Sequence, residues 1–545
     1  MTLDFKRRDF LKTILAGIPA LALDWPAFHR KEGARSDGEP YDALIIGAGL
    51  GGLSCAAAFA RQGFKPLVLE QHTVPGGYAT TFRRAGGFVF DASLHSTTVE
   101  KRNGIPNLIP GFPEIEDIVF VPHKGLYRVV YPEHDIRVPN EDPESYIKLL
   151  TGIFPEEKAG IEGVFKDMKG LSEDLARYSR AGGKVDMSRV PVDFPTLFKC
   201  FQRTWGAVLE SWIADPKLRA VISALWGYFG LPPSRLASLY YMMPTWGYLV
   251  GGGYYPIGKS QKISDALVEF IEERGGNVKL GTRVDKILVR EHAAYGVQAD
   301  DGERFEAGVV VSNANAYDTF HSMMDESAYL KDYLARMDGF SISLSSYQIF
   351  LGLNRDLTGE TGIEDSEIFF NTGYDVEDDY RAALEADIEN QGFGLTLYDN
   401  LYPKYSPAGK NTVNITVLQG FKHWEKYAAA YWKGDKAAYR KEKERMADIL
   451  IAKVEKALLP GLKDAVEVME IGTPLTNIRY TGNTRGAIYG WDQTLDNAMP
   501  RRLGHKTPIA NLFLAGAWTQ PGGGYGAVIP SGLSCFGEIM KEWKS

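Results

Sequence analysis

The hydrophobic pattern of residues 41–70 predicts a strand, a helix and a second strand in close succession. Ala43–Ile46 is a continuous apolar run, which is typical of a buried parallel strand. Residues 53–61 combine small and apolar side chains, as does a helix that packs closely on a sheet. Residues 65–69 form a second apolar run, so the three elements together predict a βαβ unit and an α/β fold.

The turn between the first strand and the helix carries Gly47, Gly49 and Gly52 in the spacing G-x-G-x-x-G. The first glycine permits a tight turn, the second lets the backbone approach a pyrophosphate, and the third allows close packing of helix on strand. The helix N-terminus offers amide N–H groups and partial positive charge to the anion. Glu70 ends the second strand, where an acid can accept the ribose hydroxyls of an adenosine. This order predicts binding of FAD or NAD and disfavours the 2′-phosphate of NADP.

A second glycine-rich segment follows Glu70 and contains Pro75, Gly76, Gly77 and Tyr78. Consecutive glycines let two backbone amides lie against a phosphate or a flavin edge without an intervening Cβ. The stretch G-F-V-F-D comes next along the chain. With these motifs the chain resembles the FAD-dependent phytoene desaturase, carotenoid isomerase and retinol saturase family. The sequence L-E-Q-H at residues 69–72 most resembles the retinol saturase branch.

The resemblance extends from Tyr41 to Ile539, and it implies both a fold and FAD as the cofactor. The implied fold is α/β, a FAD-binding Rossmann-like domain of the glutathione reductase or amine oxidase type with an inserted α+β substrate domain. In this family the backbone of a valine contacts the adenine, and a late glycine motif contacts the flavin. The expected FAD-binding residues are Gly47, Ala48, Gly49, Gly51, Gly52, Glu70, Gly76, Gly77, Tyr78, Val284, Gly516, Ala517, Ala527 and Val528.

Two positions depart from the family pattern close to the expected flavin. Ala517 stands where many related flavoproteins have Asp, so contact with the ribityl chain or phosphate there would be made by the backbone. Ser93 stands where the family usually has Gly, which changes the expected shape of the pocket.

The resemblance also implies a discontinuous domain organisation. The FAD-binding domain is expected in three pieces, 40–104, 250–320 and 470–545. The substrate-binding domain is expected to comprise 105–249 and 321–469. Residues 194–255 hold fourteen aromatic residues, about twice the 12% average of the chain. Such density suits a long apolar ligand or a membrane interface, although an ordinary aromatic core would give the same pattern.

The N-terminal 39 residues are interpreted as an export signal and a linker. Residues 6–12 read K-R-R-D-F-L-K, which resembles the twin-arginine export consensus, and residues 20–22 offer a small-x-small cleavage site. The apolar stretch at 13–22 is too short to span a bilayer. A basic tail is the alternative interpretation. Export by this route predicts a location in the periplasm or on the outer face of the inner membrane.

Electron partners follow from the same observations. The chain has one complete dinucleotide fingerprint and therefore no second nucleotide fold for NAD(P)H. A compartment outside the inner membrane also lacks a nicotinamide pool. The expected partners are a membrane quinone, oxygen, or none for an isomerase.

Composition excludes several classes of protein. The net charge of −8 argues against a nucleic-acid partner. The three cysteines, Cys55, Cys200 and Cys535, are far apart and lack the spacing of a metal site, so buried thiols and no metal are expected.

The implied function is a FAD-dependent oxidoreductase that acts on carbon–carbon single or double bonds of a carotenoid-like or retinoid-like isoprenoid. Desaturation, saturation and cis–trans isomerisation all remain open. The catalytic candidates are His95, Tyr489 and Tyr525, since the resemblance places them near the flavin ring; each could instead be a packing residue or a pocket wall.

Two other functions share this architecture. A flavin amine oxidase would want an aromatic cage and a lysine near the flavin, and Pro75-Gly76-Gly77-Tyr78 replaces the Gly-Gly-Arg form common in that group. A non-catalytic prenyl-lipid carrier would bind an isoprenoid without redox chemistry, but it would not need an intact fingerprint or Glu70.

Overall fold

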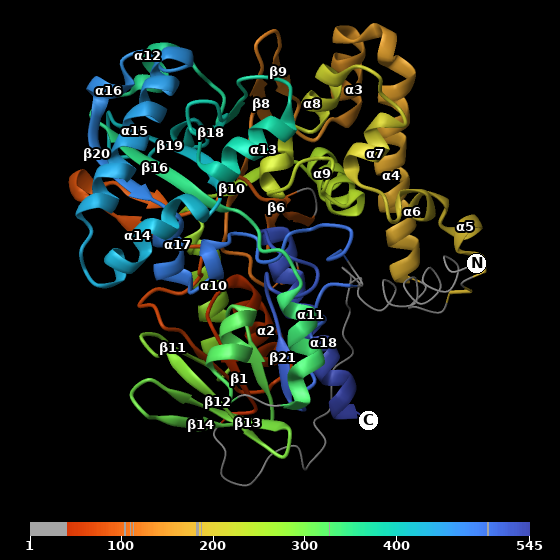
Figure 1. Cartoon of the computed structure of the whole chain (residues 1–545), viewed down its shortest axis with the longest axis vertical. Coiled ribbons are helices and arrows are strands. Elements are labelled where there is room, and N and C mark those ends of the chain that lie inside the picture. The colour runs from red at the N-terminus through yellow and green to blue at the C-terminus, as the bar shows by residue number, and fades with distance from the viewer. Residues whose placement is uncertain are drawn as a thin grey trace.

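The computed structural model describes residues 41–544 apart from 103–104, 110, 113, 181–184, 187, 326–327 and 499–500. The expected export signal and linker lie outside the described residues. Figure 1 shows two parts, a lower one built around a parallel sheet and an upper one built around a larger mixed sheet with helices beside it. No helix in the described part of the chain is long and apolar enough to cross a membrane.

The lower part is organised around a five-stranded sheet in which every neighbouring pair is parallel. Its strands in spatial order are β11 (Asn277–Lys279), β2 (Pro66–Leu69), β1 (Ala43–Ile46), β15 (Val310–Ser312) and β21 (Leu512–Leu514). The two apolar runs predicted as strands are therefore adjacent at the centre of the sheet. Parallel strands buried on both faces account for their continuous apolar sequences.

Alternate residues of β1 face two different layers. Ala43 and Ile45 pack in one core with three helices, α2 (Leu50–Arg61), α10 (Gln261–Glu272) and α18 (Tyr525–Lys544). Leu44 and Ile46 pack in another core. That second core includes the antiparallel sheet of β12 (Val284–Arg290), β13 (Ala293–Ala299) and β14 (Arg304–Glu306). The parallel sheet is thus covered by helices on one face and by strands on the other, which confirms the expected FAD-binding type of fold.

Helix α2 begins at Leu50, three residues before the predicted start at residue 53. Gly51 and Gly52 therefore belong to its first turn. Sequence pattern alone favours a later start because glycine is a poor helix former. Close packing of the turn on the sheet outweighs this preference.

The upper part contains a seven-stranded sheet that is antiparallel except between β17 and β8. Its spatial order is β20 (Val466–Gly472), β16 (Ser345–Leu353), β19 (Asn411–Gln419), β18 (Phe393–Thr396), β17 (Glu367–Phe370), β8 (Tyr127–Val130) and β9 (Asp135–Val138). One face of the sheet packs on α14 (Lys422–Trp432) and α15 (Ala437–Ala457). The shorter helices of this region are α12 (Leu357–Thr361), α13 (Val376–Glu385), α16 (Leu462–Ala465) and α17 (Pro474–Thr481).

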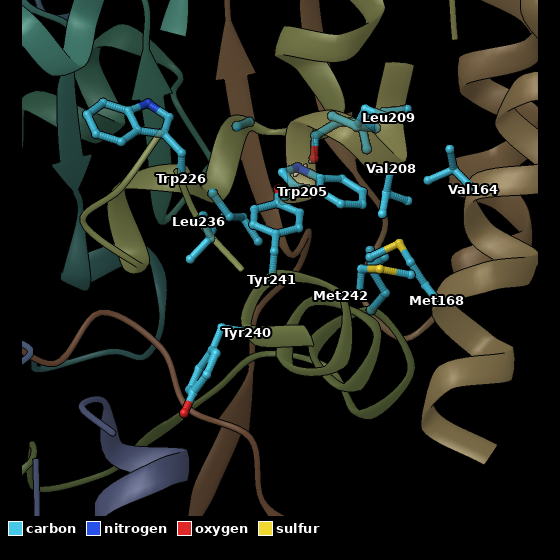
Figure 2. Packing of buried hydrophobic residues seen from close by; sticks show 14 of the residues in the cluster. Val164, Met168, Trp205, Val208, Leu209, Trp226, Leu236, Tyr240, Tyr241 and Met242 are labelled. Carbon is cyan, nitrogen blue, oxygen red and sulfur yellow. Dashed lines mark hydrogen bonds between the residues drawn. The ribbon is translucent and has the colours of Figure 1, made fainter. Parts of the chain in front are cut away.

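A helical region lies beside this sheet and contains the aromatic-rich segment. It comprises α3 (Pro143–Ile153), α4 (Lys158–Arg180), α5 (Val190–Asp193), α6 (Pro195–Cys200), α7 (Trp205–Glu210), α8 (Pro216–Ile222) and α9 (Ser238–Gly251). Trp205 stacks on Tyr241 with ring centroids 4.5 Å apart, and Met168 of α4 faces Met242 of α9 (Figure 2). Part of the aromatic density is therefore ordinary core.

Three pairs of short strands and helix α11 complete the described structure. β7 (Phe120–Pro122) pairs with β10 (Tyr254–Pro256), and two hairpins are formed by β3 (Thr81–Arg83) with β4 (Val89–Asp91) and by β5 (Glu100–Arg102) with β6 (Ile105–Leu108). Helix α11 (Lys331–Asp338) falls within the expected substrate-binding range, yet Met337 packs in the core of Leu44 and Ile46. The side chain of Met337 is therefore buried beside the lower sheet.

Candidate functional site

A continuous cavity of about 1910 Å³ extends from the glycine turns of the parallel sheet to the mixed sheet of the upper part. Sites for one drug-sized ligand are usually roughly 300–1,000 Å³. The volume therefore accommodates a dinucleotide together with a second molecule.

The first glycine turn leaves no room for side chains. Gly47 has φ +95°, a left-handed conformation that favours glycine. A Cβ on Gly52 would lie 2.2 Å from the carbonyl oxygen of Gly47, and a Cβ on Gly51 would lie 2.7 Å from the Cα of Gly516. Helix, strand and C-terminal motif meet here through their backbones, which is the geometry that a pyrophosphate-binding turn requires.

The second glycine turn packs directly on the first. The N–H of Gly76 donates to the carbonyl of Ala48 at 2.8 Å, and Gly76 has φ +119°. A Cβ on Gly77 would lie 3.4 Å from the Cα of Gly49. Helix α2 begins at this junction with neither a capping side chain nor an acidic residue in its first turn. Its terminal N–H groups thus remain suited to an anion.

Glu70 is held by two backbone N–H groups. Its Oε2 accepts from Ala48 at 2.7 Å and its Oε1 accepts from His72 at 2.8 Å. Burial raises the pKa of Glu70, although the backbone N–H groups of His72 and Ala48 oppose the shift. Each carboxylate oxygen keeps further acceptor capacity, so the group is positioned to accept ribose hydroxyls.

The remaining expected FAD-binding residues divide into two sets. Ala48, Gly52 and Gly516 lie outside the cavity lining and hold the turns together. For instance, the N–H of Gly516 donates to Ser531 Oγ at 3.0 Å. The residues that line the cavity are Gly47, Gly49, Gly51, Glu70, Gly76, Gly77, Tyr78, Val284, Ala517, Ala527 and Val528.

These features fit an adenine dinucleotide. A Cβ would clash at Gly51, Gly52 and Gly76, the N-terminus of α2 has no capping side chain, and the Glu70 carboxylate directly follows strand β2. Ala517 lines the cavity, and its carbonyl accepts from Arg502 Nη2 at 2.8 Å. The alanine offers no polar side chain, so any polar contact it makes with a cofactor uses its backbone.

His95 lines the same cavity in a neutral state. Its Nδ1 lies 2.6 Å from the hydroxyl of Thr396, on strand β18. Burial lowers the pKa of His95 to about 4. The ring is therefore uncharged near neutral pH and can offer one donor and one acceptor.

The two tyrosine candidates also line the cavity. The Tyr489 hydroxyl donates to the carbonyl of Gly227 at 2.9 Å. The Tyr525 hydroxyl donates to the carbonyl of Tyr78 at 3.1 Å and lies 3.4 Å from Ser93 Oγ. Burial raises the pKa of both phenols. The structure brings all three catalytic candidates to one cavity, while their roles stay predictions.

The far end of the cavity is lined by large apolar side chains. They come from residues 226–243 and from strands β17 and β18, and they include Trp226, Phe229, Met243, Phe369 and Phe393. Of the four tryptophans in the aromatic-rich segment, Trp226 belongs to this lining, whereas Trp205 is fully buried in the helical core. The segment therefore serves both as core and as cavity wall.

Glu367 is a cavity residue that no sequence motif predicts. It is the first residue of β17 and is only 3% exposed, yet it lines the cavity between aromatic side chains. The only signal in the sequence is an acid at the head of the apolar run E-I-F-F. The strand pairings that place it in the cavity are not visible in the sequence.

Comparisons with known proteins agree with this geometry. The family model described as "Flavin containing amine oxidoreductase" matches residues 50–535. Prolycopene isomerase 1, chloroplastic, from an Oncidium hybrid cultivar is 27% identical over 537 residues, covering 94% of this chain and 85% of that protein. All-trans-retinol 13,14-reductase from Danio rerio is 25% identical over 558 residues, covering 92% of this chain and 86% of that protein.

Solved structures show the same fold at lower identity. Putrescine oxidase bound to putrescine has a TM-score of 0.59 at 15% identity, covering 92% of this chain and 99% of that one. Cyclohexylamine oxidase from Brevibacterium oxydans also has a TM-score of 0.59 at 15% identity, covering 93% and 100%. The glycine turns, Glu70 and the match over most of the chain lead to one conclusion: this protein belongs to the flavin-containing amine oxidoreductase family, and its cofactor is FAD.

Proposed function

We propose that this enzyme acts on carbon–carbon single or double bonds of a long apolar isoprenoid, carotenoid-like or retinoid-like. The observation that carries the proposal is the continuous cavity. The two glycine turns line one end of it, and the other end is an aromatic chamber lined by Trp226, Phe229, Met243, Phe369 and Phe393. The names of the two sequence relatives, a prolycopene isomerase and a retinol 13,14-reductase, support the same class of substrate. The reaction is desaturation, saturation or cis–trans isomerisation of such a bond.

The chain's own residues would hold FAD by its adenosine and pyrophosphate. Glu70 would accept the ribose hydroxyls, Val284 would contact the adenine, and the N–H groups of the two glycine turns and of α2 would bind the pyrophosphate. When bound, FAD supplies hydride exchange at carbon. His95 and Tyr525 are the proposed side chains for contact with the reacting atoms, whereas Tyr489, whose hydroxyl is bonded to the Gly227 carbonyl, is proposed as a pocket wall.

The aromatic chamber would orient the substrate and exclude water. A polyene has few polar groups, so its position depends on shape and on contacts with ring faces. Burial of such a chain among Trp226, Phe229 and Phe369 contributes about 25 cal/mol per Å² of apolar surface. These contacts would help to place one bond of the chain beside the cofactor.

An amine oxidase is the second candidate, favoured by the family description and by the solved structures. Among the described residues that line the cavity there is no lysine of the kind expected near the flavin of such an enzyme. The oxidase structures are also more distant in sequence, at 15% identity against 25–27% for the isoprenoid enzymes. An isoprenoid substrate is therefore the better-supported proposal.

A non-catalytic prenyl-lipid carrier is the third candidate. It would have no use for two interlocked glycine turns or for a carboxylate fixed by two N–H groups. These features favour an enzyme with bound FAD.

We further propose that the enzyme is exported by the twin-arginine route to the periplasm or the outer face of the inner membrane. Its electrons would then be exchanged with a membrane quinone or oxygen, or with no external partner in an isomerase. The test is anaerobic stopped-flow mixing with NADH, NADPH and a reduced quinone analogue. Rapid and saturable flavin reduction by either nicotinamide would contradict this proposal.

Peripheral membrane contact is proposed for the outer face of α9. Met243 and Val250 are 42% and 48% exposed and lie seven residues apart, hence on one side of the helix. Met243 also lines the cavity, so the apolar face borders the substrate chamber. A membrane-dissolved substrate could enter from a bilayer that contacts this face.

Product analysis tests the proposed function directly. The purified enzyme is incubated with retinoids and carotenoids, and products are identified by mass and absorption. Loss of two hydrogens indicates desaturation, gain of two indicates saturation, and unchanged mass with a changed retention time indicates isomerisation. No conversion of any isoprenoid under oxidising or reducing conditions would contradict the proposal.

A further inference from the structure

Strand β17 places a carboxyl group inside the aromatic chamber. Glu367 and Phe369 lie on the same side of the strand and both line the cavity, whereas Ile368 points into the core behind the sheet. Glu367 is almost completely buried. The acidic side chain of Glu367 thus lies beside the apolar ring of Phe369 on the cavity side of the strand.

This carboxyl group is only half satisfied by the protein. Its Oε1 accepts a hydrogen bond from the hydroxyl of Tyr228. Its Oε2 has no hydrogen-bond partner, and no lysine, arginine or histidine pairs with it, among the residues that the structure describes. A buried polar group left without a partner costs about 1–3 kcal/mol, so such a group calls for a functional explanation.

Further polar groups surround Glu367. Thr396 lies directly opposite on β18, and its hydroxyl contacts His95. The hydroxyls of Ser96 and Tyr248 are buried without a well-aligned partner in the described structure, and both residues line the cavity. Burial raises the pKa of Tyr248 and the charge of Glu367 raises it further, whereas the side chains of Ser96 and Tyr228 oppose the shift. Glu367 therefore belongs to a cluster of polar groups beside the aromatic wall of the cavity.

The protonation state of Glu367 suits an uncharged oxygen group of a ligand, such as a hydroxyl or a carbonyl. Burial raises the pKa of Glu367 to about 7, although the Tyr228 hydrogen bond opposes the shift. Protonated and ionised forms are both present near neutral pH, so the group can donate to a carbonyl or accept from a hydroxyl. A site for a permanent cation would instead keep the pKa of the carboxyl low.

We propose that Glu367, with Tyr228 and the hydroxyls beside it, forms a subsite for an oxygen function, a hydroxyl or carbonyl, carried by the isoprenoid ligand. The inference rests on the proposed function and narrows it to oxygenated isoprenoids. A purely hydrocarbon chain would bury Oε2 against carbon and leave it unpaired. A ligand oxygen supplies the missing partner and fixes which part of the chain lies at the cofactor.

The test compares two ligands of equal shape. One is all-trans-retinol, and the other is the same carbon skeleton with a methyl group in place of the hydroxymethyl group. Dissociation constants are measured on the holoenzyme from changes in flavin and tryptophan fluorescence. We expect the wild-type protein to bind the alcohol at least about tenfold more tightly, since a hydrogen bond to a charged or polar buried group has this order of effect.

Variants assign the preference to Glu367. Glu367→Leu is expected to weaken binding of the alcohol about tenfold and to leave the hydrocarbon unchanged or tighter, whereas Glu367→Gln keeps most of the preference. Glu364→Gln removes an exposed carboxylate nearby and should change neither constant. If Glu367→Leu retains no flavin, Glu367→Met provides the same comparison with a more adaptable side chain.

Other results would overturn the inference. Equal affinities in the wild-type protein, or an equal loss for both ligands in Glu367→Leu, would show that no oxygen subsite exists. A slower turnover in Glu367→Leu with unchanged ligand preference would assign the carboxyl to catalysis instead. Failure of both ligands to bind, with flavin reduction by amines, would contradict the proposed function as well.

Discussion

The two ends of the cavity use polar groups in opposite ways. At the cofactor end, backbone N–H groups of two glycine turns converge and side chains are excluded, since a Cβ added to Gly52 would lie 2.2 Å from a backbone oxygen. At the substrate end, aromatic side chains form much of the wall, and a cluster of polar side chains that includes Glu367 interrupts it. The backbone at the cofactor end therefore fixes the shape of the cofactor that can bind. At the substrate end, recognition depends on individual side chains, so a single substitution can alter the ligand preference.

The largest expected effect concerns the cofactor end. In Gly52→Val, a Cβ must occupy space 2.2 Å from the Gly47 carbonyl oxygen, and neither backbone can move without breaking the turn. We expect the variant to retain no FAD, measured by absorbance after gel filtration. Gly152→Ala in α3 is the control, because its Cβ meets open space, and it should gain about 0.5–1 kcal/mol of stability. Normal flavin content in Gly52→Val would refute the close-packing argument.

The second effect is a pH dependence at the substrate end. Since the folded-state pKa of Glu367 is raised from 4.5 to about 7, the unfolded chain releases this proton first, and the free energy of unfolding falls as pH rises from about 5 to 8. Glu367→Gln should remove up to about 3 kcal/mol of that fall. His95 and His123, with lowered pKa values, destabilise the fold toward acid in both proteins and cancel in the comparison.

The measurement is thermal unfolding of both proteins across this pH range. We expect the Glu367→Gln variant to be more stable than the wild-type protein at pH 8 and to show little difference at pH 5. Parallel curves would show that the carboxyl group is not buried as described.

A smaller effect is expected at the ribose. Glu70→Ala removes a doubly accepting carboxylate and should weaken FAD binding by about 1.5–3 kcal/mol. Reconstitution of the apoprotein at limiting FAD measures the change. Unchanged flavin occupancy would show that the ribose is held by other groups.

The smallest effect is expected for Tyr489→Phe. Its hydroxyl is already bonded to the Gly227 carbonyl, so it acts as part of the wall. Turnover should fall by less than about tenfold, which corresponds to the loss of one neutral hydrogen bond. A far larger loss with unchanged substrate binding would identify the phenol as a group that contacts the reacting atoms.

The cofactor end could be predicted from sequence because its parts are adjacent along the chain. Gly47, Gly49, Gly52 and Glu70 belong to one βαβ unit, so their spacing alone defines the turn and the ribose position. β1 pairs with β2 as predicted, and Glu70 lines the cavity, whereas its contact with the ribose stays a prediction. The predicted start of α2 was wrong because close packing on the sheet overrides the preference of glycine against helices.

The substrate end could not be predicted in the same way. Glu367, Thr396 and His95 meet only because β17 pairs with β18 and a distant loop reaches the same wall. The parallel pairing of β17 with β8 joins segments from both inserted ranges. Pairing between distant strands produces no local sequence pattern. The alternation of apolar and polar residues in a strand predicts which side chains share a face, but it does not predict which strands are neighbours.

The most direct test of the proposed function is an anaerobic titration of the enzyme-bound flavin with retinoids, carotenoids, quinols and simple amines. We expect a saturable spectral change with isoprenoids, strongest for oxygenated ones, and no bleaching by amines. Bleaching of the flavin by amines together with no response to any isoprenoid would contradict it.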